Sequence, residues 1–550
     1  RDPEMSRGLG DVYKRQTLEN RFGVNKMELI SLKYAIFVIV LLVLYYCFPK
    51  KYRWYVLLAG SMAYYVIICK WYVLFIIFTI CTTYGSTIWI DKLLKEQNAI
   101  VKSHKEDWDR QTRKEYKEKG RKKRVAVMLF ALLCNFGILA FLKYIPYAGE
   151  LGLLLPLGIS FYTFQSMGYV MDVYREIVEP EKNFLKVALF VSFFPQIIQG
   201  PIAIYDKLAG QLYEGHSLRL ENLQKGALLV LWGVMKKLVI ADRAVNIINF
   251  VMDKPMDFSG TYVFFAAVVY ALQLYADFSG GIDIVRGIAE MFGITMSTNF
   301  NHPYFSRSLT EYWHRWHMTL GDWCRNYIFY PLSISKRFLN FGKWLKPRFG
   351  AHISKVLPGC IASVITFIVI GVWHGANMKY LCFGLWNGIV IMLAELFAPV
   401  NKKVAGGFFK LTGLREKGIF ATIVSVLWTF MLILVGYYFD IAANASTAFH
   451  MLFKSVTDFH ISELGINNII LNLGACGLDE YDILLLIICT LLWFFISFVE
   501  ENKKLDMRDF ILSRKLPLRW AIIYLGIFIV IIFGYYGPGV NPADFVYMQF

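Results

Sequence analysis

The sequence predicts an all-α membrane protein with about 11–12 membrane-spanning helices, some of them broken or re-entrant and forming a central funnel. Three observations lead to this fold class. The 550 residues are 57% hydrophobic and only 18% charged, whereas soluble domains carry about 25% charge. Long apolar runs recur, each close to the roughly 20 residues that cross a bilayer. The runs are continuous rather than alternating, which disfavours the strands of a membrane barrel.

The predicted spans near the N-terminus flank a strongly basic segment. Three spans are expected between residues 30 and 90, and a fourth covers 125–142. Residues 92–124 hold thirteen Lys or Arg against six Asp or Glu. We expect a cytoplasmic loop there, because basic loops mark the cytoplasmic face of a bacterial cell membrane. The net charge of +17 therefore fits contact with anionic lipid headgroups and not with nucleic acid.

The middle of the chain contains interrupted helices. Residues 155–176 are divided by glycines and polar side chains, and the run 184–202 is expected to break at Pro195 and again at Gly200-Pro201. Non-helical backbone at membrane depth needs protein or a wet cavity around it, so we expect these segments to line the funnel. Short amphipathic helices at the interface are expected later, and ordinary spans elsewhere. The amphipathic helices fall in 295–350, and the spans at 225–241, 261–276, 356–373 and 380–399, with about three more after 418.

The chain is expected to form a single membrane domain from residue 27 to residue 550, with a catalytic core at about 150–400. Residues 1–26 are polar and are set aside as a non-native or disordered extension, because MELISLKYAIF begins at Met27. The nine cysteines are scattered without a C-x-x-C pair. We therefore expect neither a disulfide framework nor a bound metal.

Two polar sites stand out against the apolar background. The stretch EYWHRWHMTLGDW (311–323) contains His314 and His317, which would lie on one face of a continuous helix. In GVWHGANMKY (371–380), His374 ends a long apolar run. Ionisable residues at membrane depth are functional candidates by default. A neutral imidazole can take a proton from a hydroxyl or thiol near pH 7, so we predict His374 and His317 as catalytic residues in acyl transfer.

Neighbouring polar side chains are predicted to bind the donor or substrate. Arg315, Arg325 and Asn377 are expected to orient a carbonyl or hold an acidic donor, with Trp316 and Asp277 as further binding residues. Other classes of protein fit less well. A metal site would need more ligands, and a serine hydrolase would need a G-x-S-x-G turn. A transporter would need paired charges within its spans in two related halves, and the sequence shows no such pairing. A scaffold would leave the histidines without a purpose.

Several motifs resemble those of the membrane-bound O-acyltransferase family, in the same order along the chain. They are PLGISFYTFQSMGYVMDVYR, FFPQIIQGPI, ADFSGGIDIVRGIAEMFG, NFNHPYFSRSLTEYWHRWHMTL, GVWHGA and the terminal DFVYMQF. The set is most similar to the alginate O-acetyltransferase branch. The teichoic acid D-alanyl transferases share the Arg-Trp-His and Trp-His-Gly elements, so D-alanyl transfer remains an alternative.

The resemblance implies an O-acetyltransferase that helps to acetylate an exported polysaccharide. The family's catalytic histidine falls on His374, and its Arg-Trp-His histidine falls on His317. The implied co-substrate is an acyl donor such as acetyl-CoA, with no tightly bound cofactor. The implied partners are the lipid bilayer and either the polysaccharide or an extracytoplasmic acetyltransferase. Two positions depart from the pattern: His314 stands where Arg is common, and Asp440 stands in a segment where alginate-type members have Phe-Arg-Ala.

Overall fold

The computed structural model describes residues 29–145, 155–412, 418–465 and 476–536, with the single residues 153, 415, 468 and 545. Within these ranges the regular structure is helical and contains no strand. The chain forms two compact units: one holds residues 1–224 and 288–296, and the other holds 225–287 and 297–550. The predicted all-α class is confirmed. That the chain from residue 27 onward acts as one domain stays a prediction.

The described residues contain eight helices long and apolar enough to cross a membrane, so the protein is an integral membrane protein. This is fewer than the predicted 11–12, for two reasons. The apolar helix α2 (Leu32–Cys47) and the run Phe184–Gln199 are shorter than the others, and α3 and α4 form one continuous stretch. The eight are Lys50–Ser103, Arg110–Tyr144, Gly260–Met291, Lys336–His374, Met378–Leu396, Ile419–Ile441, Glu480–Lys503 and Leu516–Phe533.

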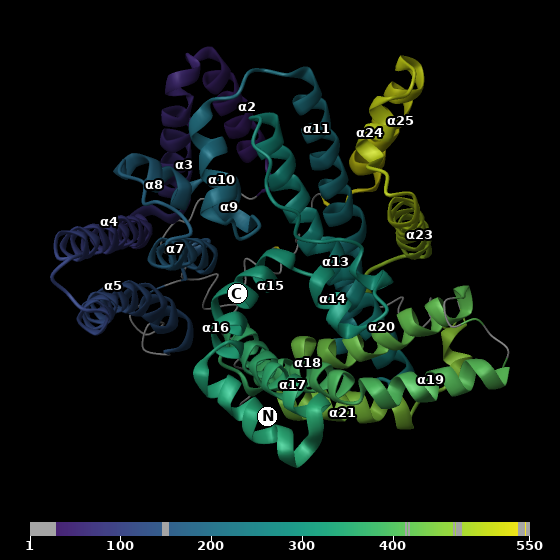
Figure 1. Ribbon diagram of the computed structural model, residues 1–550. Helices are drawn as coiled ribbons and strands as arrows, with labels where there is room; N and C mark the ends of the chain where they lie inside the picture. The colour runs from purple at the N-terminus through teal and green to yellow at the C-terminus, as the bar shows by residue number, and fades with distance from the viewer. Residues whose placement is uncertain are drawn as a thin grey trace. The chain divides into compact units, whose positions relative to one another are not determined.

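The first unit begins with two helical pairs (Figure 1). Helix α2 packs on α3 (Arg53–Cys69), and α4 (Val73–Ser103) packs on α5 (Arg110–Tyr144). The prediction of a loop at 92–124 is wrong, because helices extend through most of it. Lys, Arg and Glu are good helix formers, and Asp109 caps α5 by accepting hydrogen bonds from the backbone of Gln111 and Thr112. The basic residues therefore lie on the ends of two long helices.

The remaining helices of this unit include the predicted break. Helix α7 (Ile159–Tyr174) is buried on nearly every side, and α10 (Tyr205–Glu214) follows α8 and α9. The break lies at Phe193, between α8 (Phe184–Ser192) and α9 (Phe194–Gln199), and not at Pro195. Proline fits the first turn of a helix but disfavours helical geometry in the residues before it. The second predicted break is confirmed, since α9 ends at Gly200. That these breaks line a funnel stays a prediction.

The second unit is built around α11 and α13. Helix α11 (Leu220–Met235) continues as a π-helical turn (Lys236–Ala241) into α12 (Asp242–Met252). It packs closely against α13 (Gly260–Met291), because Gly226 faces Gly287 and Gly233 faces Gly280 across the contact. Small residues let helix backbones approach in this way in membrane proteins. The predicted span at 225–241 is therefore a helix that loses its α geometry at two adjacent lysines.

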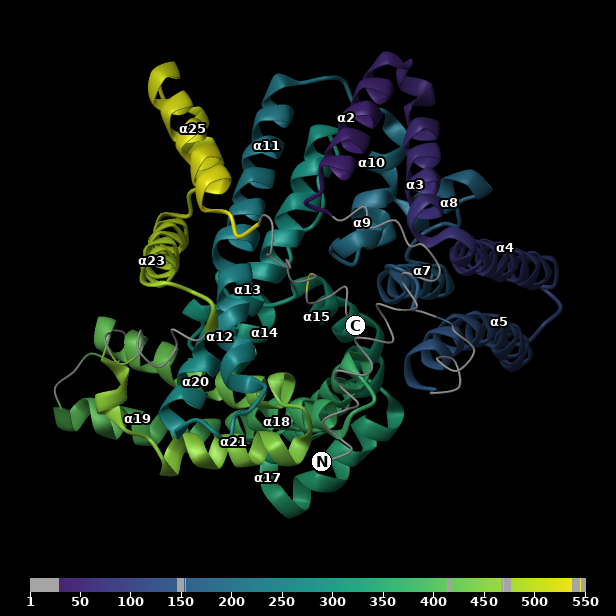
Figure 2. The ribbon, with the colours of Figure 1, turned by 180° about the vertical axis from the view of Figure 1, so that it is seen from behind.

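The rest of the second unit is a set of helices that surround this pair (Figures 1 and 2). Helices α17 and α18 are joined by a short turn and pack closely, with Gly371 against the backbone of Tyr380. The helices are α14 (Leu309–Arg315), α15 (Met318–Cys324), α16 (Tyr330–Ser333), α17 (Lys336–His374), α18 (Met378–Leu396), α19 (Ala398–Thr412), α20 (Ile419–Ile441), α21 (Ala445–Thr457), α23 (Glu480–Lys503), α24 (Met507–Leu512) and α25 (Leu516–Phe533).

A buried network of charges joins the π-helical turn to α13. Lys237 contacts Asp277 at 2.7 Å and Asp242 at 2.8 Å, and Lys236 contacts Asp283 at 2.6 Å. These are charge pairs of a kind that the sequence did not reveal, and they join neighbouring segments of the second unit. The partners of α13 lie 40 and 47 residues away in the sequence, so no local pattern reveals them. The two lysines neutralise carboxylates that would otherwise be buried alone at high cost.

We expect Lys237→Met to lower the free energy of unfolding by about 3–5 kcal/mol, because it leaves two buried carboxylates without their cation. Thermal and denaturant unfolding of the purified protein in detergent measures this loss. Adding Asp277→Asn to the same chain should recover part of the stability, whereas Lys95→Met, at an exposed pair with Asp91, should change little. Equal losses at Lys95 and Lys237 would contradict this role for the network.

Candidate active site

The two histidines predicted as catalytic lie at the ends of different helices, His317 at the start of α15 and His374 at the end of α17. Ser308 caps α14 by accepting a hydrogen bond from the backbone of Glu311, and α14 ends at Arg315. His317 then adopts a left-handed conformation with φ of 43° and starts α15. The single helix expected to place His314 and His317 on one face is therefore broken between them. A non-glycine residue with positive φ is strained and persists only when its surroundings hold it.

Hydrogen bonds to Asn299 hold His317 in this backbone conformation. Asn299 Oδ1 accepts hydrogen bonds from the backbone N–H of Thr319 at 3.1 Å, from Thr319 Oγ1 at 2.8 Å, and from His317 Nδ1 at 3.1 Å. The backbone N–H can only donate, so the atom facing it is the amide oxygen. It follows that His317 carries its proton on Nδ1 and keeps Nε2 as its basic nitrogen. Both Asn299 and His317 are buried.

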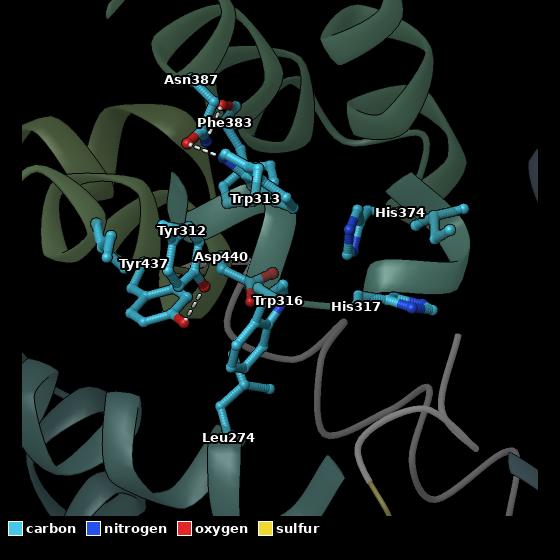
Figure 3. Close-up of a pocket in the computed structure, with 12 residues that line it drawn as sticks. Leu274, Tyr312, Trp313, Trp316, His317, His374, Phe383, Asn387, Tyr437 and Asp440 are labelled. Atoms are coloured by element: carbon cyan, nitrogen blue, oxygen red, sulfur yellow. Dashed lines mark hydrogen bonds between the residues drawn. The ribbon is translucent and has the colours of Figure 1, made fainter. Parts of the chain in front are cut away.

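His374 reaches the same place from another part of the chain. It is the last residue of α17, whose long apolar run carries it to a turn before Gly375. The ring of Trp373 lies next to both histidines, with centroids 6.2 Å from His317 and 4.9 Å from His374. Figure 3 shows the two histidines near each other on one side of a pocket that both of them line. The structure thus places both histidines at one pocket, and their predicted catalytic roles stay predictions.

The pocket is narrow and largely aromatic. Its volume is about 20 Å³, which is room for roughly one water molecule. Its walls come from α13, α14, α15, α17, α18 and α20, all in the second unit. The lining residues are Leu274, Tyr312, Trp313, Trp316, His317, Leu320, His374, Phe383, Asn387, Ile433, Tyr437 and Asp440.

Hydrogen bonds fix the polar edges of these aromatic walls. Tyr312 and Tyr437 share a hydrogen bond of 2.7 Å between their hydroxyls. Trp313 Nε1 donates to Asn387 Oδ1 at 3.0 Å. Figure 3 shows both pairs on the side of the pocket opposite the histidines. These contacts tie α14 to α18 and to α20, so the shape of the pocket depends on three separate helices.

Among the described residues, Asp440 is the one carboxylate that lines the pocket. It lies near the end of α20, and its Oδ2 accepts a hydrogen bond of 2.7 Å from the Tyr270 hydroxyl. In the sequence, Asp440 is recognisable only as a departure from the alginate-type pattern. The sequence nevertheless contained a signal for Asp440. It is an acidic residue within the apolar run IVSVLWTFMLILVGYYFDI, where a carboxylate is energetically costly unless it has a partner or a role.

Trp316 lines the pocket, and its role in binding stays a prediction; the four other predicted binding residues do not line it. Arg315 pairs with Glu311 at 2.8 Å and with Glu501 at 3.0 Å. The roles of these four residues (Arg315, Asp277, Arg325 and Asn377) in binding a donor stay predictions, because each of them has a different partner in the structure. Asp277 pairs with Lys237, Arg325 with Asp322 and His314, and Asn377 caps α18 through the backbone N–H of Lys379.

The described part of the chain contains no group of three or more His, Cys, Asp or Glu residues placed to hold a metal ion. The chemistry of the pocket is therefore best described through its imidazoles and carboxylate. Burial lowers the pKa of His317 to about 3, and the nearby His374 lowers it further in the same direction. His317 lies outside the eight apolar spans. It is therefore a neutral hydrogen-bonding group at physiological pH.

Residues 180–346 match the membrane-bound O-acyltransferase family, a segment that includes His317 and ends before His374. One curated relative, named probable alginate O-acetylase AlgI, from Pseudomonas syringae pv. tomato, is 30% identical over 56% of this chain and 54% of its own length. A peptidoglycan O-acetyltransferase of Helicobacter pylori is 30% identical over 50% and 56%, and a teichoic acid D-alanyltransferase of Bacillus subtilis is 26% identical over 51% and 67%. The chain spans little more than half the length of the first two.

The lowered pKa of His317 predicts how stability depends on pH. The unfolded chain binds a proton at this residue below its ordinary pKa of 6.5, whereas the folded chain does not until about pH 3. Stability from this group is thus complete above pH 6.5 and falls as the pH drops towards 3. Between pH 7.5 and pH 5 the loss should be about 2 kcal/mol. Thermal unfolding of wild type and His317→Gln at both pH values measures it; an equal pH dependence in both would contradict the assignment.

Proposed function

We propose, from the premise that residues 180–346 belong to the membrane-bound O-acyltransferase family, that this protein is an O-acyltransferase for an exported cell-surface polysaccharide. The acyl group is acetyl, and a thioester such as acetyl-CoA supplies it from the cytoplasm. The observation that carries the proposal is the shared pocket. Two histidines from separate segments, His317 and His374, line one aromatic cavity, and the first lies inside the segment that matches the family.

His374 acts as the general base in this proposal. It takes the proton from the attacking hydroxyl while that oxygen bonds to the carbonyl carbon of the thioester. The C–S bond then breaks, and the thiolate leaves with the proton that His374 returns. His317 has its proton held on Nδ1 by Asn299, so its neutral ring accepts a hydrogen bond and orients the reacting groups. Trp316 and the other aromatic walls exclude water, which limits hydrolysis of the thioester.

In this proposal the thioester reaches the pocket from the cytoplasmic side and the acceptor hydroxyl from the outer side, so the acyl group crosses the membrane as it is transferred. We place the protein in a bacterial cell membrane, with the basic residues 92–124 on the cytoplasmic face, where anionic lipids attract them. Bilayer-spanning helices around the pocket support a route across the membrane. The acceptor on the outer side is the polysaccharide itself or an extracytoplasmic acetyltransferase that passes the group on. Relatives named for alginate and peptidoglycan acetylation support this class of acceptor.

A second candidate is transfer of D-alanine to teichoic acid, and one observation favours it. Asp440 places a carboxylate in the pocket beside the histidines, and a D-alanyl group carries an ammonium that a carboxylate would attract. An acetyl group has no charge to meet there. A relative named for D-alanyl transfer to teichoic acid supports the same alternative.

Replacing the general base tests the main proposal. His374→Ala should lower acyl transfer by about 10²–10⁴-fold, the usual contribution of a positioned base. Transfer of the labelled acetyl group from acetyl-CoA to a glycan acceptor measures the rate. His352→Ala, on the same helix but exposed, is the matched control and should keep the wild-type rate. Normal transfer in the His374 variant would reject the assignment.

Asp440 separates the two candidate acyl groups. If the natural substrate is acetyl, Asp440→Asn should change the rate with an acetyl donor by less than about threefold, since no charged partner is lost. If it is D-alanyl, the same variant should lose about tenfold or more with a D-alanyl donor, because its ammonium loses an ionic hydrogen bond. Parallel assays of wild type and variant with both donors decide between them.

A further inference from the structure

The second unit contains another cavity, of about 720 Å³. Its volume falls within the range of small-molecule sites, about 300–1,000 Å³. Helices α11, α13, α23, α24 and α25 line it, together with residues 298–302. Helices α11, α23 and α25 lie near one another in both ribbon views (Figures 1 and 2). None of the residues that line the histidine pocket lines this cavity.

The cavity changes from apolar to charged along its length. On α23, one face runs from Leu492 and Trp493 through Ile496 to Glu500 and Glu501, as the helical period requires. Its apolar part is completed by Leu and Ile side chains of α11 and α25. Large apolar side chains elsewhere on α25 are exposed, including Tyr524 and Phe528. The apolar part therefore lies where hydrocarbon chains of the bilayer would meet the protein.

The charged end is balanced in sign. Its four cationic side chains are matched by four carboxylates. These groups pair with one another, as Lys236 does with Asp283 and Arg508 with Asp506. A ligand with a net charge would add a charge without a counterion, whereas a zwitterion keeps this end of the cavity neutral. The cations are Lys236, Arg286, Lys504 and Arg508, and the carboxylates are Asp283, Glu500, Glu501 and Asp506.

Three buried polar atoms of residues that line this cavity have no hydrogen-bond partner. They are Asn299 Nδ2, His302 Nδ1 and Glu501 Oε2. Asn299 is only 1% exposed, and its Oδ1 is fully used by His317 and Thr319. Buried polar groups are nearly always paired with protein, water or a ligand, so three such atoms around one cavity indicate a site for a polar group.

The three atoms also belong to one neighbourhood. Arg315 bonds both the backbone oxygen of Asn301 and the carboxylate of Glu501, and His302 Nε2 lies 3.7 Å from Glu500. The segment 298–302 is therefore held against the end of α23. The amide N–H can only donate, the carboxylate oxygen can only accept, and the imidazole nitrogen can donate. A ligand at this site must have both an acceptor and a donor in its polar head.

We propose that this cavity binds a membrane phospholipid with a phosphoethanolamine headgroup. The phosphate accepts hydrogen bonds from Asn299 Nδ2 and His302 Nδ1, and the ammonium donates to Glu501 Oε2. A hydrocarbon chain lies along the apolar faces of α11, α23 and α25. A choline headgroup has no N–H to donate, and an anionic glycerol headgroup has no positive charge for the carboxylates. This site is independent of the proposed acyl transfer, and binding alone tests it.

The test uses the full purified chain in detergent, with palmitoyl-oleoyl phosphatidylethanolamine, phosphatidylcholine or phosphatidylglycerol added at equal concentration. Phosphatidylethanolamine should raise the midpoint of thermal unfolding by about 2 °C or more, because a ligand that binds only the folded state stabilises it. The other two lipids should give less than half of that shift. Native mass spectrometry should show one retained phosphatidylethanolamine per chain.

Two variants with matched controls locate the site. Ile496→Trp fills the apolar part and should abolish the shift for every lipid, whereas Phe495→Trp, on the exposed neighbouring face, should keep it. Glu501→Gln should remove the preference for phosphatidylethanolamine over phosphatidylcholine, whereas Glu480→Gln, at the other end of α23, should preserve it. An equal or larger shift with phosphatidylglycerol, or a full shift in Ile496→Trp, would overturn the proposal.

Discussion

The hydrogen bonds that converge on Oδ1 of Asn299 determine the arrangement of the histidine pocket. They hold His317 in a left-handed backbone conformation, start α15 through Thr319, and fix the proton of the imidazole on Nδ1. Without them the chain would have little reason to break between α14 and α15, because left-handed geometry is unfavourable for a histidine. The break turns the ring of His317 towards the segment that carries His374. One side-chain oxygen thereby sets both the backbone path and the tautomer.

The buried charges of the second unit form a separate layer of organisation. Lys236 and Lys237 lie at the π-helical turn between α11 and α12, and each reaches a carboxylate of α13. Close glycine contacts between α11 and α13 bring the chains near enough for these pairs. Asp283 lines the larger cavity, and Asp277 lies three residues after Leu274, which lines the histidine pocket. Packing and electrostatics therefore depend on the same pair of helices.

Much of this could be read from the sequence, for reasons that are local. Continuous apolar runs predict helices because each run must satisfy its own backbone in lipid. The predicted span at 356–373 corresponds to the second half of α17, after Gly350, and the span at 380–399 corresponds to α18. The importance of His317 and His374 follows from the cost of burying an imidazole. The surroundings of the predicted binding residues could not be predicted in this way. Arg315 and Asp277 form ion pairs with residues that are distant in the sequence, and sequence spacing carries no information about such partners.

Other differences arise from competition between local preferences. The basic segment 92–124 was expected as a loop because of its charge, yet Lys, Arg and Glu favour helix strongly enough to extend α4 and α5. Pro195 correctly predicted a break in this segment, but the break lies two residues earlier, at Phe193. Proline disfavours helical geometry in the backbone that precedes it. Asp440 lines the pocket from the end of α20. The sequence of α20 contains no motif apart from that single acidic residue.

The small volume of the histidine pocket has a consequence for how fast any reaction there can proceed. Its walls are linked by Tyr312 to Tyr437 and by Trp313 to Asn387. A thioester of the kind we propose is much larger than one water molecule, so the proposed reaction would require α14 to separate from α18 or α20. Helix motions of this kind take about microseconds to milliseconds, and they would set an upper limit on the proposed turnover.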